Sequence, residues 1–320
     1  MGVDPSLKQA VKARVTGRLA FDEPMAAHTW LRVGGPADVY VWPKDDAELI
    51  ALIKWLASQD VAYVIIGGGS NLLVTDKGIR GVVIDITAGI KGLSLLSGEA
   101  EEPENTEISI VQAMAGENLS RLCRFAIDKG LGGLNFAIGI PGSVGGAILM
   151  NAGAAGAAVE NVLTRVRMLF PDGRVAELQK SQLAFRYRGV TVPGAHDPLH
   201  PPVILEGWFK LQATDRDVLE KEADALLKQR RRRQPKGAAS AGCFFKNPEN
   251  AEPAGKLIEQ AGMKGVNVGD AQVSEEHANF IVNRGQATAA DIFGLMERIQ
   301  EAVYQQFHIA LEPEVRIAGE

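Results

Sequence analysis

The sequence is poor in several features that would assign it to a specialised class of protein. It has only two cysteines and five histidines in 320 residues, and it contains neither a Cys-x-x-Cys nor a His-Glu-x-x-His pattern. These shortages exclude a disulfide framework and argue against a structural zinc site, so we predict no metal. No uninterrupted apolar run reaches the roughly 20 residues that cross a bilayer, and the segment up to Phe21 lacks the apolar core of a secretory signal. We therefore expect a cytoplasmic protein without membrane insertion.

The composition that remains is typical of a globular protein with a large core. Hydrophobic residues make up 46% of the chain and charged residues 23%, with a net charge of −5. This negative balance argues against nucleic acid as a partner. The basic run Arg230–Arg233 has no aromatic residues beside it, and we interpret it as the solvated end of a helix. The alternative is that part of the run meets the diphosphate of a ligand.

The hydrophobic pattern predicts an α+β fold in three parts. Strands and helices alternate through residues 1–90 and again through residues 91–212. The third part, residues 213–320, opens with an exposed helix and ends with a short strand at Glu314–Ile317. The polar, acidic segment 96–106 is expected to be an exposed loop.

Local signals predict where several of these elements begin and end. Asp46 is expected to cap a helix, and Gly130 stands where a residue just past a helix C-terminus belongs. Thr288 with Asp291 resembles a capping box, and the turn Pro171-Asp-Gly173 indicates a hairpin. The helix expected after Asp46 has one apolar face, formed by Leu49, Leu52, Ile53 and Leu56.

Two glycine-rich segments are the most informative local feature. Gly67-Gly-Gly-Ser-Asn71 follows an apolar strand, and Gly139-Ile-Pro-Gly-Ser-Val-Gly-Gly146 continues to Gly153. Glycine is costly inside an ordinary helix or strand, so we expect bare backbone that approaches a phosphate-bearing cofactor. A run of tight turns is the alternative. The first segment has neither the Rossmann nor the P-loop spacing. The predicted cofactor-binding residues are Gly67, Gly68, Gly69, Ser70, Asn71, Gly139, Pro141, Gly142, Ser143, Gly145 and Gly146.

These segments belong to a series of six motifs in which the chain resembles the UDP-N-acetylenolpyruvylglucosamine reductases, flavoenzymes that make UDP-N-acetylmuramate for peptidoglycan. The motifs, in order, are Thr29-Trp-Leu-Arg-Val-Gly-Gly35, Gly67–Asn71, Gly139–Gly146, Tyr187-Arg188, Gly242-Cys-Phe-Phe-Lys-Asn-Pro248 and Pro313-Glu-Val-Arg316. The resemblance runs from about His28 to the C-terminus. It implies a vanillyl-alcohol-oxidase/PCMH-type FAD-binding fold of two α/β subdomains plus a C-terminal α+β substrate-binding domain. It also implies FAD as cofactor, NADPH as hydride donor and a UDP-sugar as substrate.

The resemblance further implies three catalytic residues. Hydride addition to the enolpyruvyl group leaves negative charge beside the substrate carboxylate, and Arg188 would stabilise it. Glu314 matches the family's catalytic glutamate. Cys243 stands where the family has a serine that donates a proton. A thiol, whose reference pKa is about 8.5, can also donate one. Without the family context, the preferred interpretations would be structural: Arg188 as an ordinary surface arginine, Glu314 as an edge-strand carboxylate and Cys243 as a small packed thiol. The predicted substrate contacts are Tyr187, Lys246 and Asn247.

The sequence leaves two alternative functions open. One is an FAD-dependent oxidase of the same fold that uses oxygen, and the other is a non-enzymatic nucleotide-binding module. Within the reductases, the interval between Arg188 and Asp217 leaves no room for a helical insertion. The chain is therefore expected to have the shorter form of the family, without a tyrosine-bearing loop.

Overall fold

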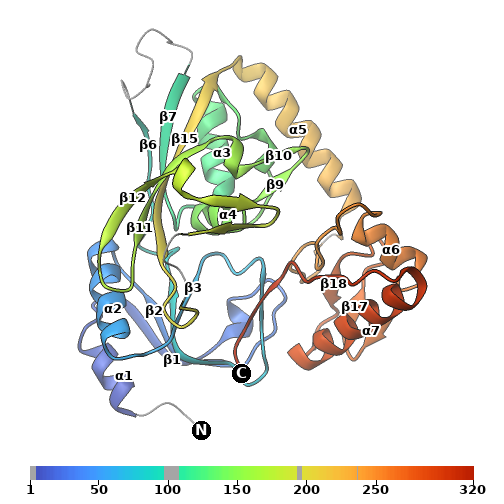
Figure 1. Ribbon diagram of the computed structural model, residues 1–320, viewed down its shortest axis with the longest axis horizontal. Helices are drawn as coiled ribbons and strands as arrows, with labels where there is room; N and C mark the ends of the chain where they lie inside the picture. The colour runs from blue at the N-terminus through green and yellow to red at the C-terminus, as the bar shows by residue number, and fades with distance from the viewer. Residues whose placement is uncertain (1–4, 97–107, 193–196, 236) are drawn as a thin grey trace. The chain divides into compact units, whose positions relative to one another are not determined.

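The computed structural model describes residues 5–96, 108–192, 197–235 and 237–320, which form a mixed α and β protein (Figure 1). The predicted loop at 96–106 lies outside these residues except for Leu96. The chain divides into two compact units. The first unit comprises Met1–Phe21, Val39–Gly68 and Gly81–Lys228, and the second comprises Asp22–Asp38, Gly69–Arg80 and Gln229–Glu320. The division into residues 1–90, 91–212 and 213–320 stays a prediction.

The larger sheet of the first unit is antiparallel and has β15 at its centre. Its order is β12-β11-β15-β7-β6, and β8 also pairs with β15. The β11–β12 pair is joined through Pro171–Gly173, which confirms the predicted hairpin. The strands are β6 (Leu93–Leu96), β7 (Ile108–Met114), β8 (Leu131–Gly132), β11 (Leu163–Leu169), β12 (Val175–Gln179) and β15 (Val203–Ala213).

Three helices accompany this sheet: α3 (Leu119–Asp128), α4 (Val144–Leu149) and α5 (Arg216–Arg233). Leu119, Leu122 and Cys123 of α3 are buried in the same core as Val111 of β7. Gly130 follows α3 with φ +66°, as predicted for a residue just past a helix C-terminus.

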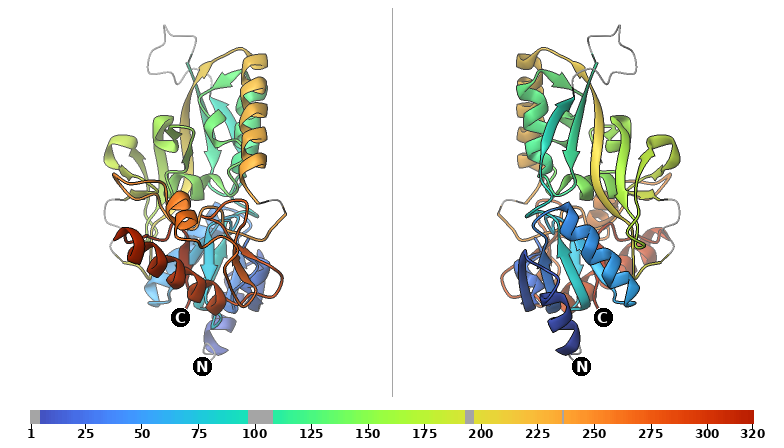
Figure 2. Two further views of the ribbon diagram at one scale, coloured as in Figure 1. Left: turned by 90° about the vertical axis from the view of Figure 1, so that its right-hand side faces the viewer. Right: turned by 90° about the vertical axis from the view of Figure 1, so that its left-hand side faces the viewer.

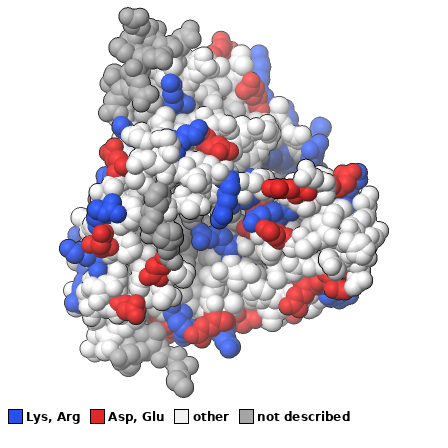
Figure 3. Space-filling view, viewed as in Figure 1, with Lys and Arg blue, Asp and Glu red and all other residues white. Residues whose placement is uncertain are grey.

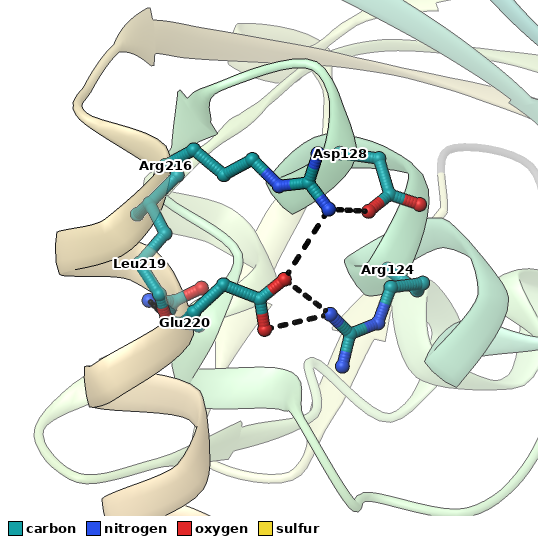
Figure 4. A network of polar contacts seen from close by, with 6 residues as sticks. Arg124, Asp128, Arg216, Leu219 and Glu220 are labelled. Atoms are coloured by element: carbon teal, nitrogen blue, oxygen red, sulfur yellow. Dashed lines mark hydrogen bonds and ion pairs between the residues drawn. The ribbon is translucent and has the colours of Figure 1, made fainter.

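Helix α5 lies alongside α3 in Figures 1 and 2, and a polar network joins them (Figure 4). Glu220 accepts two hydrogen bonds of 2.9 Å from Arg124, and Arg216 lies 3.2 Å from Asp128. These side chains are partly exposed, so such pairs stabilise only weakly. Burial of Leu219, which is 2% exposed, is the larger contribution to the docking of α5.

The second sheet has the order β1-β2-β5-β3, and β3 runs parallel to β5. Its strands are β1 (Arg18–Pro24), β2 (Pro36–Trp42), β3 (Tyr63–Ile66) and β5 (Ile79–Asp85). Helix α2 (Asp46–Ser58) follows β2, and all four residues of its predicted apolar face are buried. The predicted cap was wrong by one residue. Asp45, in an extended conformation, accepts the hydrogen bond from Glu48 N, whereas Asp46 pairs with Arg167 at 2.7 Å.

Glu48, in the first turn of α2, holds the chain that precedes the helix. Its carboxylate accepts hydrogen bonds from the backbone of Thr16, Gly17 and Lys44, and from the Thr16 hydroxyl. Burial by itself would raise the pKa of Glu48, but these hydrogen bonds outweigh it and leave the pKa below its ordinary value. The carboxylate is therefore the stable form in the folded protein.

The second unit packs two helices over a small antiparallel sheet. Helix α7 (Ala289–Phe307) begins with a capping box between Thr288 and Asp291, as predicted. The short helix α6 (Ala254–Gln260) lies beside it, and the sheet has the order β16-β17-β18. Its strands are β16 (Asn267–Val268), β17 (Ala271–Val273) and β18 (Ile281–Asn283). Separately, β4 (Leu72–Val74) pairs in parallel with β19 (Arg316–Ala318), so the last strand begins two residues later than Glu314.

The remaining elements are short. They are α1 (Pro5–Lys12), β9 (Gly153–Ala154), β10 (Ala157–Ala158), β13 (Ala184–Arg186), β14 (Gly189–Thr191) and the 3₁₀ turns at Met25–Ala27, Asn135–Ala137, Val159–Asn161 and Lys180–Gln182. Between Arg188 and the start of α5, the described residues contain no helix. In the described parts of the chain, no helix combines the length and apolar character needed to span a membrane. Acidic and basic side chains are interspersed on the face shown in Figure 3.

Candidate active site

The two glycine-rich segments meet within the first unit. Gly67 and Gly68 follow β3, and Gly142 and Ser143 precede α4. A Cβ atom at Gly67 would overlap the Ser143 hydroxyl, and one at Gly68 would lie 3.2 Å from the Cα of Gly142. At Gly67 the obstacle is the Ser143 side chain, and at Gly68 the backbone of Gly142 would have to give by a few tenths of an ångström. The pair of segments forms a bare backbone cradle of the kind that fits a phosphate-bearing cofactor such as FAD.

The second segment contains a helix, which its glycine spacing argued against. Helix α4 includes Gly145 and Gly146, and Ser143 caps it by accepting a 3.2 Å hydrogen bond from Gly146 N. Gly145 N donates to Ala115 O at 2.8 Å, and a Cβ at Gly145 would lie 2.8 Å from the Ala115 side chain. Gly145 therefore allows α4 to pack closely against Ala115, just after β7, whereas a Cβ at Gly146 would meet only Ser143 Oγ, at 3.3 Å. The amides of both glycines already donate within the protein, so a cofactor contact here would involve other atoms.

The rest of the second segment is shaped by positive backbone angles. Gly139 has φ +75° and Gly142 has φ +118°, conformations that favour glycine. Pro141 stands between them, after Ile140, whose amide donates to Ala137 O at 2.9 Å. The chain therefore turns sharply on both sides of Pro141 before α4 begins.

The end of the first segment belongs to the second unit, where it holds the predicted catalytic glutamate. Asn71 donates through Nδ2 to the carbonyl of Glu314 at 3.1 Å, and Arg316 N donates to Asn71 O at 3.1 Å. Ser70 precedes this contact, and Gly69 O accepts a 3.0 Å hydrogen bond from Trp30 N. Asn71, predicted as a cofactor ligand, thus also anchors the main chain of Glu314.

Cys243 and Glu314 lie on neighbouring segments of the second unit. Glu314 N donates to Phe244 O at 2.8 Å, and Cys243 forms a bridge with Phe280 on its other side. Phe244 and Phe245 are fully buried, whereas Cys243 and Glu314 are partly exposed. The structure therefore places two of the three predicted catalytic residues on adjacent hydrogen-bonded segments, next to two buried aromatic rings.

The two predicted substrate contacts that follow Cys243 also have protein partners. Lys246 Nζ lies 3.1 Å from Glu312 in an exposed ion pair, and Lys246 N donates to Glu312 O at 2.9 Å. Asn247 Oδ1 accepts a 3.0 Å hydrogen bond from Ala254 N and so caps helix α6. Both side chains are held in place at the end of the Cys243 segment.

Arg188 lies in the first unit, at the tip of the β13–β14 hairpin. Its backbone has φ +58°, an uncommon conformation for a residue other than glycine. Its Nη1 donates to Gly153 O at 3.1 Å, and its guanidinium lies 5.0 Å from the ring centre of Tyr187. Tyr187 is 51% exposed. The hairpin thus presents an arginine and a tyrosine together at its turn.

Two asparagines that support these residues were missed by the sequence analysis. Asn151, 4% exposed and with φ +40°, donates to Arg186 O at 3.2 Å and so anchors the hairpin that carries Arg188. Asn279, 3% exposed, bonds the backbone of Phe245. A polar residue inside the apolar run 278–282 was the available signal for Asn279.

His277 lies two residues before Asn279, in surroundings that favour the neutral imidazole. Burial lowers the pKa of its imidazole below the ordinary value. Its Nδ1 accepts a 3.2 Å hydrogen bond from Asn279 N, which requires an unprotonated nitrogen. The ring also packs edge-on against Phe280, 4.9 Å between centres. His277 therefore fixes the backbone at Asn279.

Comparison with known proteins places this arrangement among the flavoproteins. Residues 37–179 match the profile of the FAD binding domain family. Residues 234–318 match the family described as UDP-N-acetylenolpyruvoylglucosamine reductase, C-terminal domain. Together the two matches confirm the predicted α+β fold, with an FAD-binding part followed by a C-terminal domain.

Relatives over the full length define the family. The UDP-N-acetylenolpyruvoylglucosamine reductase of Desulfosudis oleivorans is 44% identical over 99% of this chain and 100% of that protein. The enzyme of that name from Bacillus subtilis is 38% identical over 97% of each chain. The crystal structure of the reductase from Thermus caldophilus has a TM-score of 0.74 and 32% identity, and covers 95% of this chain and 99% of that one. The chain belongs to the UDP-N-acetylenolpyruvoylglucosamine reductase family, and these relatives give no support to the oxidase alternative.

Proposed function

We propose that this protein is an FAD- and NADPH-dependent reductase that converts UDP-N-acetyl-3-O-(1-carboxyvinyl)-glucosamine to UDP-N-acetylmuramate, a peptidoglycan precursor, in the cytoplasm. The observation that carries the proposal is full-length similarity to reductases of this name, at 44% identity in one relative. When bound, FAD passes hydride from NADPH to the enolpyruvyl double bond. The FAD-binding subdomains are residues 1–90 and 91–212, and residues 213–320 bind the substrate.

The cofactor is held by the backbone of the two glycine-rich segments. A Cβ at Gly67 would overlap the Ser143 side chain, and one at Gly68 would crowd the backbone of Gly142. Bare backbone amides at such a junction suit a pyrophosphate, because their N–H groups can bind its negative charge without a cationic side chain. The residues assigned to the cofactor are Gly67, Gly68, Gly69, Ser70, Asn71, Gly139, Pro141, Gly142, Ser143, Gly145 and Gly146.

Arg188, Cys243 and Glu314 act on the substrate. The Arg188 guanidinium binds the substrate carboxylate and stabilises the negative charge that develops next to it. Cys243 donates the proton that completes the reduction, and Glu314 positions or polarises the protonated group. Support comes from the hydrogen bond between Glu314 N and Phe244 O, which holds these two residues on adjacent segments. Tyr187, Lys246 and Asn247 contact the UDP-sugar.

Separate measurement of the two half-reactions tests the roles. Cys243→Ser retains a proton donor and is expected to keep activity. Cys243→Ala is expected to keep NADPH-dependent flavin reduction but to lose flavin reoxidation by the UDP-substrate. Stopped-flow absorbance of the flavin measures both steps in the same enzyme. Reoxidation of Cys243→Ala at the wild-type rate would remove the donor assignment, and reoxidation by oxygen but not by substrate would remove the reductase function.

A further inference from the structure

Asn279 holds the peptide group of the residue two positions after Cys243. Its Oδ1 accepts a hydrogen bond from Phe245 N at 2.9 Å, and its Nδ2 donates to Phe245 O at 2.8 Å. A peptide N–H can only donate and a carbonyl can only accept, so one orientation of the amide makes both bonds. The Asn279 side chain, 3% exposed, therefore pairs with Phe245 as a neighbouring strand would.

The main chain around Asn279 also bonds the segment that contains Cys243, and this segment in turn bonds Glu314. Asn279 O accepts a 2.7 Å hydrogen bond from Phe244 N, and the next residue, Phe280, forms the bridge with Cys243. On the opposite side, Phe244 O accepts from Glu314 N at 2.8 Å. Phe244 therefore links the segment of Cys243 to the segment of Glu314.

The position of Asn279 is itself fixed. Its backbone N donates to His277 Nδ1 at 3.2 Å, and its side chain is buried. Asn279 thus has a hydrogen-bond partner for its N–H, its C=O and both ends of its side chain. Such a fully paired buried polar group rigidifies its surroundings.

We propose that Asn279 is a positioning residue for the substrate-reducing half-reaction and acts by holding Cys243 in register with Glu314. The inference rests on the proposed function, in which these two residues complete the reduction. Removal of the amide leaves the buried N–H and C=O of Phe245 without partners, and the segment must shift to find others. A shift of about 1 Å in a catalytic group costs on the order of a hundredfold in rate.

Two substitutions and a matched control test the proposal. Asn279→Asp keeps the acceptor for Phe245 N and loses the donor, whereas Asn279→Leu loses both at similar volume. Asn283→Asp is the control, because Asn283 is also buried, at 8% exposed, and its Nδ2 donates to Leu31 O at 2.9 Å. The aspartate substitutions therefore remove one buried donor each, at two places in the same unit. Asn279→Asp carries the test if the leucine variant does not fold.

The first readout is chemical and needs no turnover. Cys123 is 1% exposed, so iodoacetamide added to the FAD-loaded, substrate-free enzyme should alkylate Cys243, and peptide mass spectrometry verifies the site. Substitution of Asn279 is expected to change the alkylation rate at fixed pH by about threefold or more, since the thiol leaves its fixed surroundings. Asn283→Asp is expected to leave that rate unchanged.

The second readout separates the half-reactions by stopped flow. Substitution of Asn279 should slow flavin reoxidation by substrate by roughly ten- to hundredfold and leave reduction by NADPH within about twofold. Wild-type alkylation and reoxidation rates in both Asn279 variants would overturn the proposal. Failure of the proposed function has a different signature, because Cys243→Ala would then be reoxidised at the normal rate. The alkylation comparison between the Asn279 and Asn283 variants would still show whether Asn279 positions Cys243.

Discussion

Substitution of Gly67 by alanine tests the cradle directly, because Gly67 has an ordinary backbone conformation and the effect must be steric. The new Cβ would overlap Ser143 Oγ and lie 2.9 Å from Ser143 Cβ. Ser143 caps α4 through Gly146 N, so its side chain cannot move aside without releasing the helix. We therefore expect Gly67→Ala to lower both the stability of the apoprotein and its affinity for FAD.

The magnitude follows from two contributions. Loss of a serine cap costs about 1 kcal/mol, and forcing an extra carbon into a packed site costs about 1–3 kcal/mol. Gly67→Ala should therefore reduce the free energy of unfolding by roughly 2–4 kcal/mol. Glycine is itself an acceptable cap, so Ser143→Gly should cost only a few tenths of a kcal/mol. In the double variant the nearest remaining atom, Ser143 N, lies 3.9 Å away. It should recover most of that loss, about 2–3 kcal/mol relative to Gly67→Ala.

Urea unfolding of the apoproteins measures the stabilities, and quenching of flavin fluorescence measures FAD binding. Gly92→Ala is the control, because a Cβ there meets only the Met114 side chain at 3.5 Å, an ordinary contact. It should leave stability and FAD affinity near the wild-type values. A Gly67→Ala variant as stable as Gly92→Ala, or a double variant no more stable than Gly67→Ala, would refute the steric account of the cradle.

Two further predictions concern the first unit. Glu48→Gln should cost about 1–3 kcal/mol at pH 7, because a neutral amide cannot accept all the hydrogen bonds that the carboxylate receives. The lowered pKa of Glu48 means that its contribution is complete above about pH 4.5 and is lost as the pH falls, so urea midpoints of variant and wild type should converge on acidification. Asp45→Ala should cost about 1 kcal/mol by removing the cap of α2, and Asp45→Asn, an equally good cap, should be nearly neutral in the same assay. If Asp45→Ala leaves the free energy of unfolding unchanged, the assignment of the cap to Asp45 is wrong.

The sequence predicted much of this molecule because its strongest signals are local. The apolar face of α2, the capping box at Thr288 and the turn at Pro171–Gly173 each depend on residues within a few positions of one another. The six ordered motifs indicated the family and the cofactor before any contact was known. They also selected Cys243 and Glu314, which the fold places on adjacent hydrogen-bonded segments.

The errors arise where the backbone conformation, or a contact with a residue distant in the sequence, determines the role of a residue. Asp45 and Asp46 are equivalent as sequence, but only Asp45 is extended and receives Glu48 N. Gly145 is found in a helix because Ala115, thirty positions earlier, accepts its amide and leaves no space for a side chain. Asn279 interrupts an apolar run, but nothing in that run identifies Phe245 as its partner. None of these contacts is encoded in periodicity or spacing.

The structure supports each of the three proposed catalytic residues in the same way. A side-chain amide from a distant segment bonds the main chain at or near each one: Asn71 at Glu314, Asn151 at Arg186, and Asn279 at Phe245. An amide can satisfy a buried peptide group without adding charge, which matters beside groups that must bind a carboxylate or hold a proton. Aspartate would instead place a negative charge against a carbonyl oxygen. The three positions should therefore be far less tolerant of aspartate than a surface asparagine, although none of them is assigned a step in the chemistry.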